Sequence, residues 1–289
     1  MTKKLATFLA LLLVGAVLLG YGFVRGIGMV YNSAPGYETL PPALPPLVAN
    51  KKVLVFSKTD GFRHIEAIPA AKVLFSRLAK ENGWGIAFTQ NAAVHNPTQL
   101  AQFDLLVWNN VTGDVLTEGQ RAAFRTYLEE GGSVLALHGS GGSRSYKWDW
   151  YPREFIKTQF VGHPMSPQFR EATVLVEDTP HPSTAHLPKA FRHVEEWYSF
   201  ADNPRDRVTV LATVREADYA PENRTLLETL TGAGELAMGD DHPIIWHHKV
   251  GKGTVYFSAL GHSGETYALP DYQILLEEAA RWLMDQRVR

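Results

Sequence analysis

The chain has 289 residues, with 28 Lys and Arg against 30 Asp and Glu, so its formal net charge is −2. This length is enough to bury the core of one large domain or two small ones, and the balanced charge does not indicate a nucleic-acid-binding surface. Cysteine is absent from the sequence. Its absence excludes disulfides, thiolate catalysis and Cys-ligated zinc, and it suits an oxidising compartment.

The N-terminal segment carries the clearest signal about location. Lys3 and Lys4 precede an uncharged, mostly apolar stretch from Leu5 to Val24, and Arg25 follows it. A membrane-spanning helix needs about 20 such residues, whereas the apolar region of a cleaved signal has about 7–15. The length therefore predicts a transmembrane anchor within residues 1–30. The charges before it predict a single-pass inner-membrane protein with its domain exported to the periplasm. Secretion to the periplasm after signal cleavage is the alternative.

Residues 31–50 are rich in proline, which favours an extended backbone and disfavours a packed helix. The prolines are Pro35, Pro41, Pro42, Pro45 and Pro46. We interpret this segment as a spacer that leads into one domain of residues 51–289.

The first hundred residues of this domain alternate predicted strands with predicted helices. Such alternation with short connections predicts a parallel sheet that has helices on both faces. The predicted strands are 52–57, 84–89, 104–108 and 133–137, and the predicted helices are 68–82 and 117–130. After residue 150 the pattern becomes β-rich, with predicted strands at 170–177, 193–200, 207–214, 242–250 and 254–260 before a last helix at 271–285.

Polar side chains follow several of these strands. His64 and His138 each come after a predicted strand, and Asn110 follows another. A lone histidine in such a place is more often structural, but the carboxyl ends of neighbouring parallel strands share one crevice. If His64, His138 and His262 converge there, they form a three-histidine site for a divalent ion such as zinc, with one position open to water. Asp114 is expected either to orient a histidine or to cap a turn.

Two adjacent glutamates, Glu195 and Glu196, precede Trp197 and Tyr198. Because alternate residues of a strand face opposite sides, only one glutamate is expected to face the crevice, and the sequence leaves open which one. The inward glutamate is predicted to bind hydroxyls or to act as an acid or base. The His-Pro pairs, among them His242-Pro243, are more typical of tight turns than of catalysis.

A series of short motifs runs in order from about residue 52 to the C-terminus. These motifs are Gly61-Phe62-Arg63-His64, Asn109-Asn110-x-Thr112-Gly113-Asp114, Leu137-His138-Gly139, Phe160-Val161-Gly162-His163-Pro164, Glu195-Glu196-Trp197-Tyr198-x-Phe200-x-x-Asn203-Pro204-Arg205, His242-Pro243-Ile244-x-Trp246 and Leu260-Gly261-His262-x-x-Glu265-x-Tyr267. Together they resemble the trehalose-utilisation (ThuA-like) family of the class I glutamine amidotransferase-like superfamily. The resemblance implies a flavodoxin-like three-layer α/β/α sandwich with a mostly parallel sheet and a β-rich C-terminal extension. Glutamine amidotransferases carry a nucleophilic cysteine after the central strand, where this chain has His138, so glutaminase activity is excluded.

The resemblance also implies a carbohydrate-processing protein with a trehalose-like or keto-disaccharide substrate. In that hypothesis His138 or His262 is the general base, and Glu196 or Glu265 orients it or donates a proton. The residues expected to contact the sugar are Arg63, Asn110, Asp114, Trp148, Trp197, Tyr198 and His242. The alternative is a non-catalytic module that binds a sugar or a partner protein on the same fold.

Overall fold

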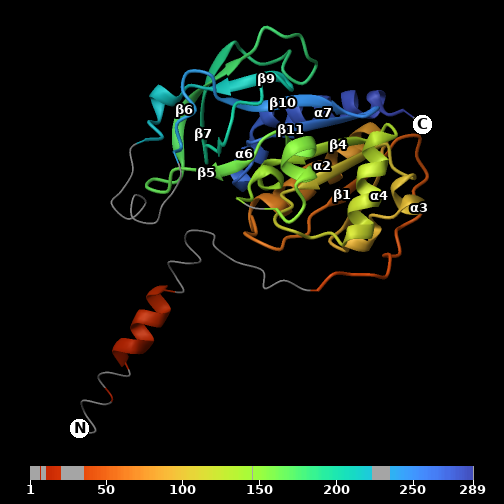
Figure 1. The fold of residues 1–289 in the computed structure, drawn as a ribbon, viewed down its shortest axis with the longest axis horizontal. Helices are drawn as coiled ribbons and strands as arrows, with labels where there is room; N and C mark the ends of the chain where they lie inside the picture. The colour runs from red at the N-terminus through yellow and green to blue at the C-terminus, as the bar shows by residue number, and fades with distance from the viewer. Residues whose placement is uncertain (1–6, 8–10, 21–35, 145, 223–234, 289) are drawn as a thin grey trace.

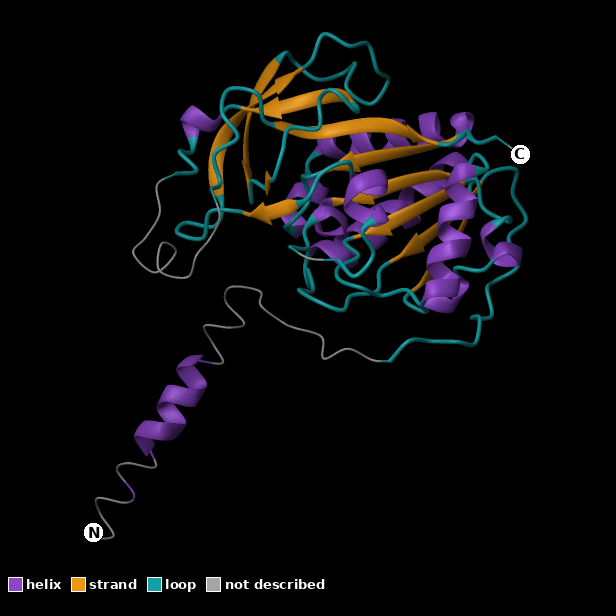
Figure 2. Ribbon diagram, in the orientation of Figure 1, coloured by secondary structure: helices purple, strands orange, loops and turns teal. Residues whose placement is uncertain are grey.

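A nine-stranded sheet organises the domain, in the strand order β2-β1-β3-β4-β11-β10-β9-β6-β7. The computed structural model describes residues 7, 11–20, 36–144, 146–222 and 235–288 (Figures 1 and 2). The strands of this sheet are β1 (Lys52–Phe56), β2 (Gly85–Thr89), β3 (Leu105–Asn109), β4 (Ser133–Leu137), β6 (Arg170–Val176), β7 (Ala190–Glu195), β9 (Thr209–Val214), β10 (Pro243–Val250) and β11 (Gly253–Ser258). A separate two-stranded sheet pairs β5 (Phe160–Gly162) with β8 (Ser199–Phe200).

The large sheet is mixed. Its eight neighbouring strand pairs comprise four parallel pairs, from β2 to β11, and four antiparallel pairs, from β11 to β7. The sheet therefore differs from the mostly parallel one that the sequence predicted, because β10, β9, β6 and β7 extend it beyond β11 by antiparallel pairing. Figure 1 shows β6, β7 and β9 at the end of the sheet away from α3 and α4.

Helices cover both faces of the parallel half. They are α2 (Ala67–Asn82), α3 (Pro97–Leu100), α4 (Glu118–Glu129), α6 (Gly264–Ala268) and α7 (Pro270–Gln286). Short 3₁₀ helices η1 (Ala92–Val94), η2 (His138–Gly141) and η4 (Glu216–Asp218) and the π-helix η3 (Tyr151–Ile156) lie between other elements. On β3, Trp108 packs on Phe124 of α4 with ring centroids 4.5 Å apart, while the next side chain, Asn109, donates to the Ile68 carbonyl of α2 at 3.0 Å. Since successive side chains of a strand point to opposite faces, α2 and α4 lie on opposite sides of the sheet.

Local sequence signals explain where these elements begin and end. Strands β3 and β4 are buried at every position, as expected for strands covered on both faces. Thr117 and Gln120 form a reciprocal capping box at the start of α4. Gly83 ends α2 with φ of 67°, a left-handed conformation that glycine adopts without a steric penalty. Because β1, β3 and β4 pair in parallel, their carboxyl ends lie at one edge of the sheet.

The N-terminal prediction needs correction. Among the described residues, no helix has the length and apolar character that a membrane span requires. Residues 11–20 are helical. At 1.5 Å per residue, ten residues extend about 15 Å, half of the about 30 Å of a hydrocarbon core. This finding shows that the prediction of a transmembrane helix was wrong. Residues 5–6, 8–10 and 21–24 of the predicted stretch lie outside the described residues.

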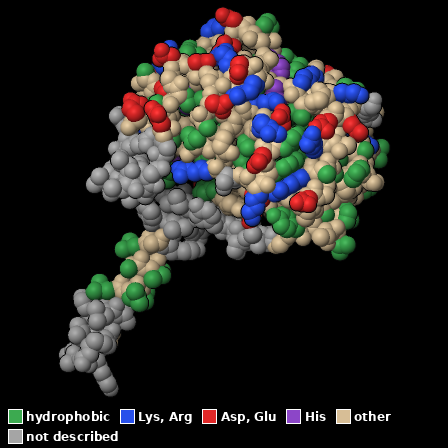
Figure 3. Space-filling model, in the orientation of Figure 1, with side chains coloured by type: hydrophobic (Ala, Val, Ile, Leu, Met, Phe, Trp, Pro, Cys, Tyr) green, Lys and Arg blue, Asp and Glu red, His purple; other side chains and the backbone are tan. Residues whose placement is uncertain are grey.

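The described part of the proline-rich segment, residues 36–50, contacts the domain. The Glu38 carboxylate forms an ion pair with Lys58 Nζ at 2.5 Å, and the Lys58 side chain is 4% exposed. Further along, the Pro42 carbonyl accepts a hydrogen bond from Gln99 of α3 at 2.8 Å. Charges of both signs are interspersed over the visible face of the domain (Figure 3), in keeping with the balanced composition.

Candidate functional site

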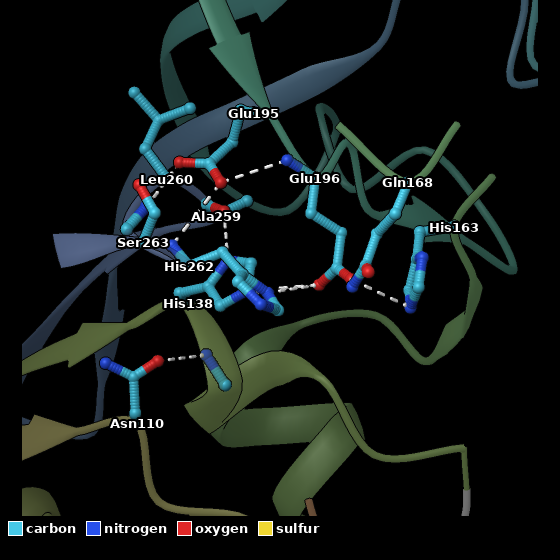
Figure 4. Close-up of polar contacts among 12 residues, drawn as sticks. Asn110, His138, His163, Gln168, Glu195, Glu196, Ala259, Leu260, His262 and Ser263 are labelled. Atoms are coloured by element: carbon cyan, nitrogen blue, oxygen red, sulfur yellow. Dashed lines mark hydrogen bonds and ion pairs between the residues drawn. The ribbon is translucent and has the colours of Figure 1, made fainter. Parts of the chain in front are cut away.

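Three histidines and a glutamate meet at the carboxyl edge of the sheet. They are His64, in the loop after β1, His138, directly after β4, Glu196, directly after β7, and His262, in the loop after β11. Each offers one nitrogen or carboxylate oxygen, and these four atoms lie within 4.8 Å of one another (Figure 4 shows His138, Glu196 and His262). His64, His138 and Glu196 are buried, and the His262 side chain is 11% exposed. We call these four residues the His/Glu cluster.

A tight turn after β4 aims His138 into the cluster. His138 has φ of 34°, and Asn110 beside it has φ of 54°. Asn110 Oδ1 accepts a hydrogen bond from the Gly139 amide at 3.1 Å, which holds the turn. His138 Nδ1 lies 2.6 Å from the Ala259 carbonyl oxygen, which only accepts, so Nδ1 carries a proton. In the neutral ring the lone pair is therefore on Nε2, which lies 3.2 Å from His262 Nδ1.

His64 completes the cluster, and one of its ring nitrogens has no hydrogen-bond partner among the described residues. Among the described residues, its buried Nδ1 accepts or donates no hydrogen bond. Burial lowers the pKa of His64 well below its ordinary value, and the neighbouring His138 and His262 lower it further. The His64 ring comes this close only because residue 139 is glycine, since a Cβ there would lie 2.7 Å from His64 Cε1. His64 is therefore neutral and presents a lone pair.

Glu196 supplies the negative charge of the cluster. Its Oε2 lies 2.8 Å from His262 Nδ1 and 3.3 Å from His138 Nε2. Its Oε1 lies 3.1 Å from His163 Nε2 and accepts a hydrogen bond from Gln168. Burial raises the pKa of Glu196, but His163, His262 and the hydrogen bonds outweigh it and hold this pKa well below the ordinary value. Glu196 is therefore ionised at neutral pH.

The other glutamate of the pair, Glu195, points away from the cluster (Figure 4). Its carboxylate is fully buried and accepts hydrogen bonds from the backbone amides of Gly261 at 2.7 Å, Glu196 at 2.9 Å and His262 at 3.3 Å. Burial raises the pKa of Glu195, but the His193 side chain, His138 and these amides lower it below its ordinary value. Glu195 thus holds the loop that carries His262, and Glu196 is the inward residue that the sequence left open.

The cluster has the composition and spacing of a metal site. Three of its candidate ligand atoms, on His138, His262 and Glu196, lie 2.8–3.3 Å from one another. Ligand atoms at tetrahedral zinc, with bonds of about 2.1 Å, lie about 3.4 Å apart. The proton of His138 Nδ1 on a backbone carbonyl is the second contact that commonly orients a metal-binding histidine. With one ring nitrogen of His64 as the fourth ligand atom, the residues fit a divalent transition-metal ion.

A cleft of about 330 Å³ opens onto the cluster. Tyr198 lines it and packs on the His138 ring with centroids 4.2 Å apart. Arg144 adds a cation to the lining, and His163, whose side chain is 19% exposed, adds a group that can exchange protons. Apolar and aromatic walls with a few polar groups are typical of small-molecule sites.

Other residues predicted from the sequence support the cluster from outside. Asn110 is fully buried and holds the turn at Gly139. His242 is fully buried between Glu216, 2.7 Å from its Nδ1, and the Tyr198 carbonyl, 2.7 Å from its Nε2. Both residues position elements of the cleft, and neither is among the residues that line it.

The remaining predicted residues lie elsewhere. Asp114 pairs with Arg121 at 2.9 Å, and the Trp197 indole is buried with its nitrogen on a backbone carbonyl. Trp148 stacks on a neighbouring tryptophan with ring centroids 4.7 Å apart. Glu265 is exposed and lines another groove, and Arg63 lines a second cleft at the same sheet edge. The structure does not bring these residues to the cluster.

The sequence interpretation missed two residues that contact Glu196. His163 was taken as structural because it precedes a proline, although it belongs to one of the ordered family-like motifs. Gln168 carries no recognisable signal, because its position depends on how the loop between β5 and β6 folds over the cluster. Both side chains contact Oε1 of Glu196, the carboxylate oxygen that does not contact His138 or His262 (Figure 4).

Comparisons with known proteins agree with this architecture. The profile of the ThuA family, described as trehalose utilisation, matches residues 52–283. The chain belongs to the ThuA family. A search of curated proteins gave no significant match.

Solved structures resemble the fold of this ThuA-family protein. A ThuA-like protein from Bacteroides uniformis aligns with a TM-score of 0.68 and 21% identity, over 84% of this chain and 94% of that one. A ThuA-like protein from Parabacteroides merdae aligns with a TM-score of 0.57 and 17% identity, over 84% of this chain and 92% of that one. At these identities the likeness establishes the fold alone.

Proposed function

We propose that this ThuA-family protein binds a divalent metal ion, such as zinc, in the His/Glu cluster and uses the site to process a carbohydrate. The observation that carries the proposal is the convergence of four side chains, His64, His138, His262 and Glu196, each of which offers one ligand atom within 4.8 Å of the others. Imidazole nitrogens and a carboxylate oxygen are ligands that divalent transition metals prefer in proteins. A metal ion at the centre of the cluster would contact all four residues.

The protonation states of the cluster support this role. His64 is neutral and Glu196 is ionised, and these are the forms that bind metals. His262 donates to Glu196 in the metal-free arrangement, and the Glu196 carboxylate raises the pKa of His262 above its ordinary value in spite of burial, which lowers it. Metal binding would therefore release a proton from His262. When bound, the ion supplies Lewis acidity toward a sugar hydroxyl or carbonyl oxygen.

Side chains around the cluster take the remaining roles. His138 and His262, which the sequence predicted as general bases, serve as ligands in this proposal. Proton exchange with the substrate falls to His163, which is part-exposed and lies 3.1 Å from Glu196 Oε1. Tyr198 fixes the His138 ring by packing on it, and the cleft of about 330 Å³ has room for one sugar ring beside the ion.

The family description and the chemistry together favour a trehalose-like or keto-disaccharide substrate. A keto or hydroxyl oxygen of such a sugar is a ligand suited to a divalent ion held by nitrogen and carboxylate donors. Because the sequence has no cysteine, thioester chemistry on glutamine is excluded. The substrate's identity within this class is part of the proposal.

The test measures metal content and turnover on the same preparations. The wild-type chain is expected to hold about one equivalent of a divalent ion and to convert trehalose or a 3-keto-disaccharide. His138→Asn and His262→Asn should lose both properties. His186→Asn is the matched control, because His186 is exposed and contacts a backbone carbonyl of α7.

Two results would contradict the proposal outright: full turnover by the His138→Asn protein and full turnover by wild type from which the metal has been removed. Saturable sugar binding without product, in protein that retains its metal, would instead support the non-catalytic sugar-binding alternative.

A further inference from the structure

A second cleft lies at the same edge of the sheet, on the other side of the loop that carries His64. Its volume is about 640 Å³, and Ser57, Thr89 and Asn109 line it at the ends of β1, β2 and β3. Helix α2 forms its other wall. The residues that line this cleft are different from those that line the cleft at the His/Glu cluster. The two clefts are therefore separate sites.

The topology of the sheet favours ligand binding at this position. From β1 the chain runs to β2 on one side and then crosses to β3 on the other side, so the strand order reverses between β1 and β3. Open α/β sheets bind ligands in the crevice that such a reversal leaves at the carboxyl ends of the strands. The His/Glu cluster lies beside β4 and β11, further along the same edge.

The charged residues that line the second cleft are cationic. They are Arg63 and Lys72, and the described residues that line the cleft include no Asp or Glu. The Arg63 side chain is half-buried and donates to the Thr59 hydroxyl at 3.2 Å, and among the described residues no carboxylate pairs with it. Lys72 is exposed and lies over the Phe88 ring, 5.3 Å from its centroid, also without a described carboxylate partner. Four of the five guanidinium N–H donors of Arg63 therefore stay available for an anion.

The rest of the lining suits an organic group attached to that anion. Phe88 and Ile68 give the cleft an apolar wall, and Gln90, Asn91 and Thr89 give it amide and hydroxyl groups. A volume of about 640 Å³ lies within the range of small-molecule sites and exceeds what inorganic phosphate alone would fill. One arginine guanidinium can donate hydrogen bonds to two oxygens of the same phosphate, and a lysine ammonium adds a positive point charge.

We propose that this second cleft binds a phosphomonoester of sugar or nucleoside size, with its phosphate between Arg63 and Lys72 and its organic part against Phe88. The sequence placed Arg63 among the sugar contacts of the His/Glu cleft. The structure separates it from His64, its neighbour in the chain, so that the two residues serve different ligands.

Calorimetric titration of the full chain tests the proposal with four probes: glucose 6-phosphate, AMP, glucose and glucuronate. At least one phosphomonoester is expected to bind saturably with a Kd below about 1 mM, while glucose does not. Arg63→Gln and Lys72→Gln should each weaken that binding by about tenfold, because each removes a charge-assisted contact. Lys80→Gln should leave it unchanged, since Lys80 is an exposed lysine of the same helix that does not line the cleft.

Several results would overturn this assignment. They are the absence of saturable binding by either phosphomonoester, equal affinities in the Arg63→Gln and Lys80→Gln proteins, and glucuronate binding as tightly as glucose 6-phosphate. His138→Asn separates this inference from the proposed function. That variant should lose metal and turnover but keep its affinity for the phosphomonoester.

Discussion

Removing the charge of Glu195 should destabilise the protein without removing any group from the His/Glu cluster. In Glu195→Gln, one carboxylate oxygen becomes an amide nitrogen. The two Glu195 oxygens accept from the amides of Gly261, Glu196 and His262 and from the Thr266 hydroxyl, and the side chain is fully buried. The glutamine side chain has only one acceptor oxygen, so at least one buried hydrogen-bond donor faces the side-chain NH2 group, which cannot accept a hydrogen bond.

The size of the effect follows from these contacts. Leaving one buried donor unsatisfied costs about 1–3 kcal/mol, and the hydrogen bonds that remain lose their ionic character, which contributes about 1 kcal/mol more. We expect the free energy of unfolding to fall by about 2–4 kcal/mol. Metal affinity should fall as well, because the loop from Gly261 to His262 loses the anchor that sets the position of His262.

Urea unfolding followed by circular dichroism, at equal metal loading, measures this loss. Glu265→Gln is the matched control, since it makes the same chemical change at an exposed residue near the same loop. That control is expected to unfold within about 0.5 kcal/mol of wild type and to keep full activity. If Glu195→Gln is as stable as Glu265→Gln, the support that we assign to Glu195 is refuted.

Three further changes test other parts of the structure. Burial lowers the pKa of His95 from 6.5 to about 4, so between these pH values the unfolded chain binds a proton that the folded chain does not. The free energy of unfolding should therefore decrease by up to about 3 kcal/mol as the pH falls from 6.5 toward 4. Urea titrations of His95→Phe over this pH range should show a smaller decrease, and the same decrease as in wild type would contradict the prediction. Gly139→Ala should weaken metal binding at least tenfold, because the new Cβ would lie 2.7 Å from His64 Cε1 and displace the ring. Unchanged affinity in a zinc titration would show that the metal does not need the His64 ring in its observed position. Glu38→Gln should lower the free energy of unfolding by about 2 kcal/mol, since it leaves Lys58 buried beside a neutral partner. Equal stability in thermal or urea unfolding would mean that the ion pair between Glu38 and Lys58 does not stabilise the fold.

The parts of the fold that depend on local signals were predictable from the sequence. The central strand was expected at 133–137 and is observed there, because glycines bound an apolar run on both sides. The helix expected at 117–130 is observed at Glu118–Glu129, with its capping box. The family was also recognised from its ordered motifs, and the match over residues 52–283 confirms it.

The direction in which neighbouring side chains point could not be predicted in the same way. Arg63 and His64 are adjacent in the chain, yet their side chains line different clefts. Glu195 and Glu196 point to opposite sides, and only contacts with the distant loop after β11 decide which one enters the cluster. Pairings over such sequence separations leave no periodic pattern in the chain.

Residue types alone did not predict two other features of the structure. The aromatic residues Trp148 and Trp197 were expected to hold sugar, but one stacks on a neighbouring tryptophan and the other is buried in the core. The apolar N-terminal stretch satisfied a length criterion, yet no described helix meets the requirement for a membrane span. Residue type alone therefore did not predict where these two side chains lie or how far the described N-terminal helix extends.

Anomalous diffraction at the zinc absorption edge, from crystals of the full chain grown with zinc, tests the central claim most directly. We predict one strong peak bonded at about 2.1 Å to one nitrogen of His64, His138 Nε2, His262 Nδ1 and a Glu196 oxygen. A cluster without such a peak, in which His262 Nδ1 still lies about 2.8 Å from Glu196 Oε2, would contradict the proposed metal site.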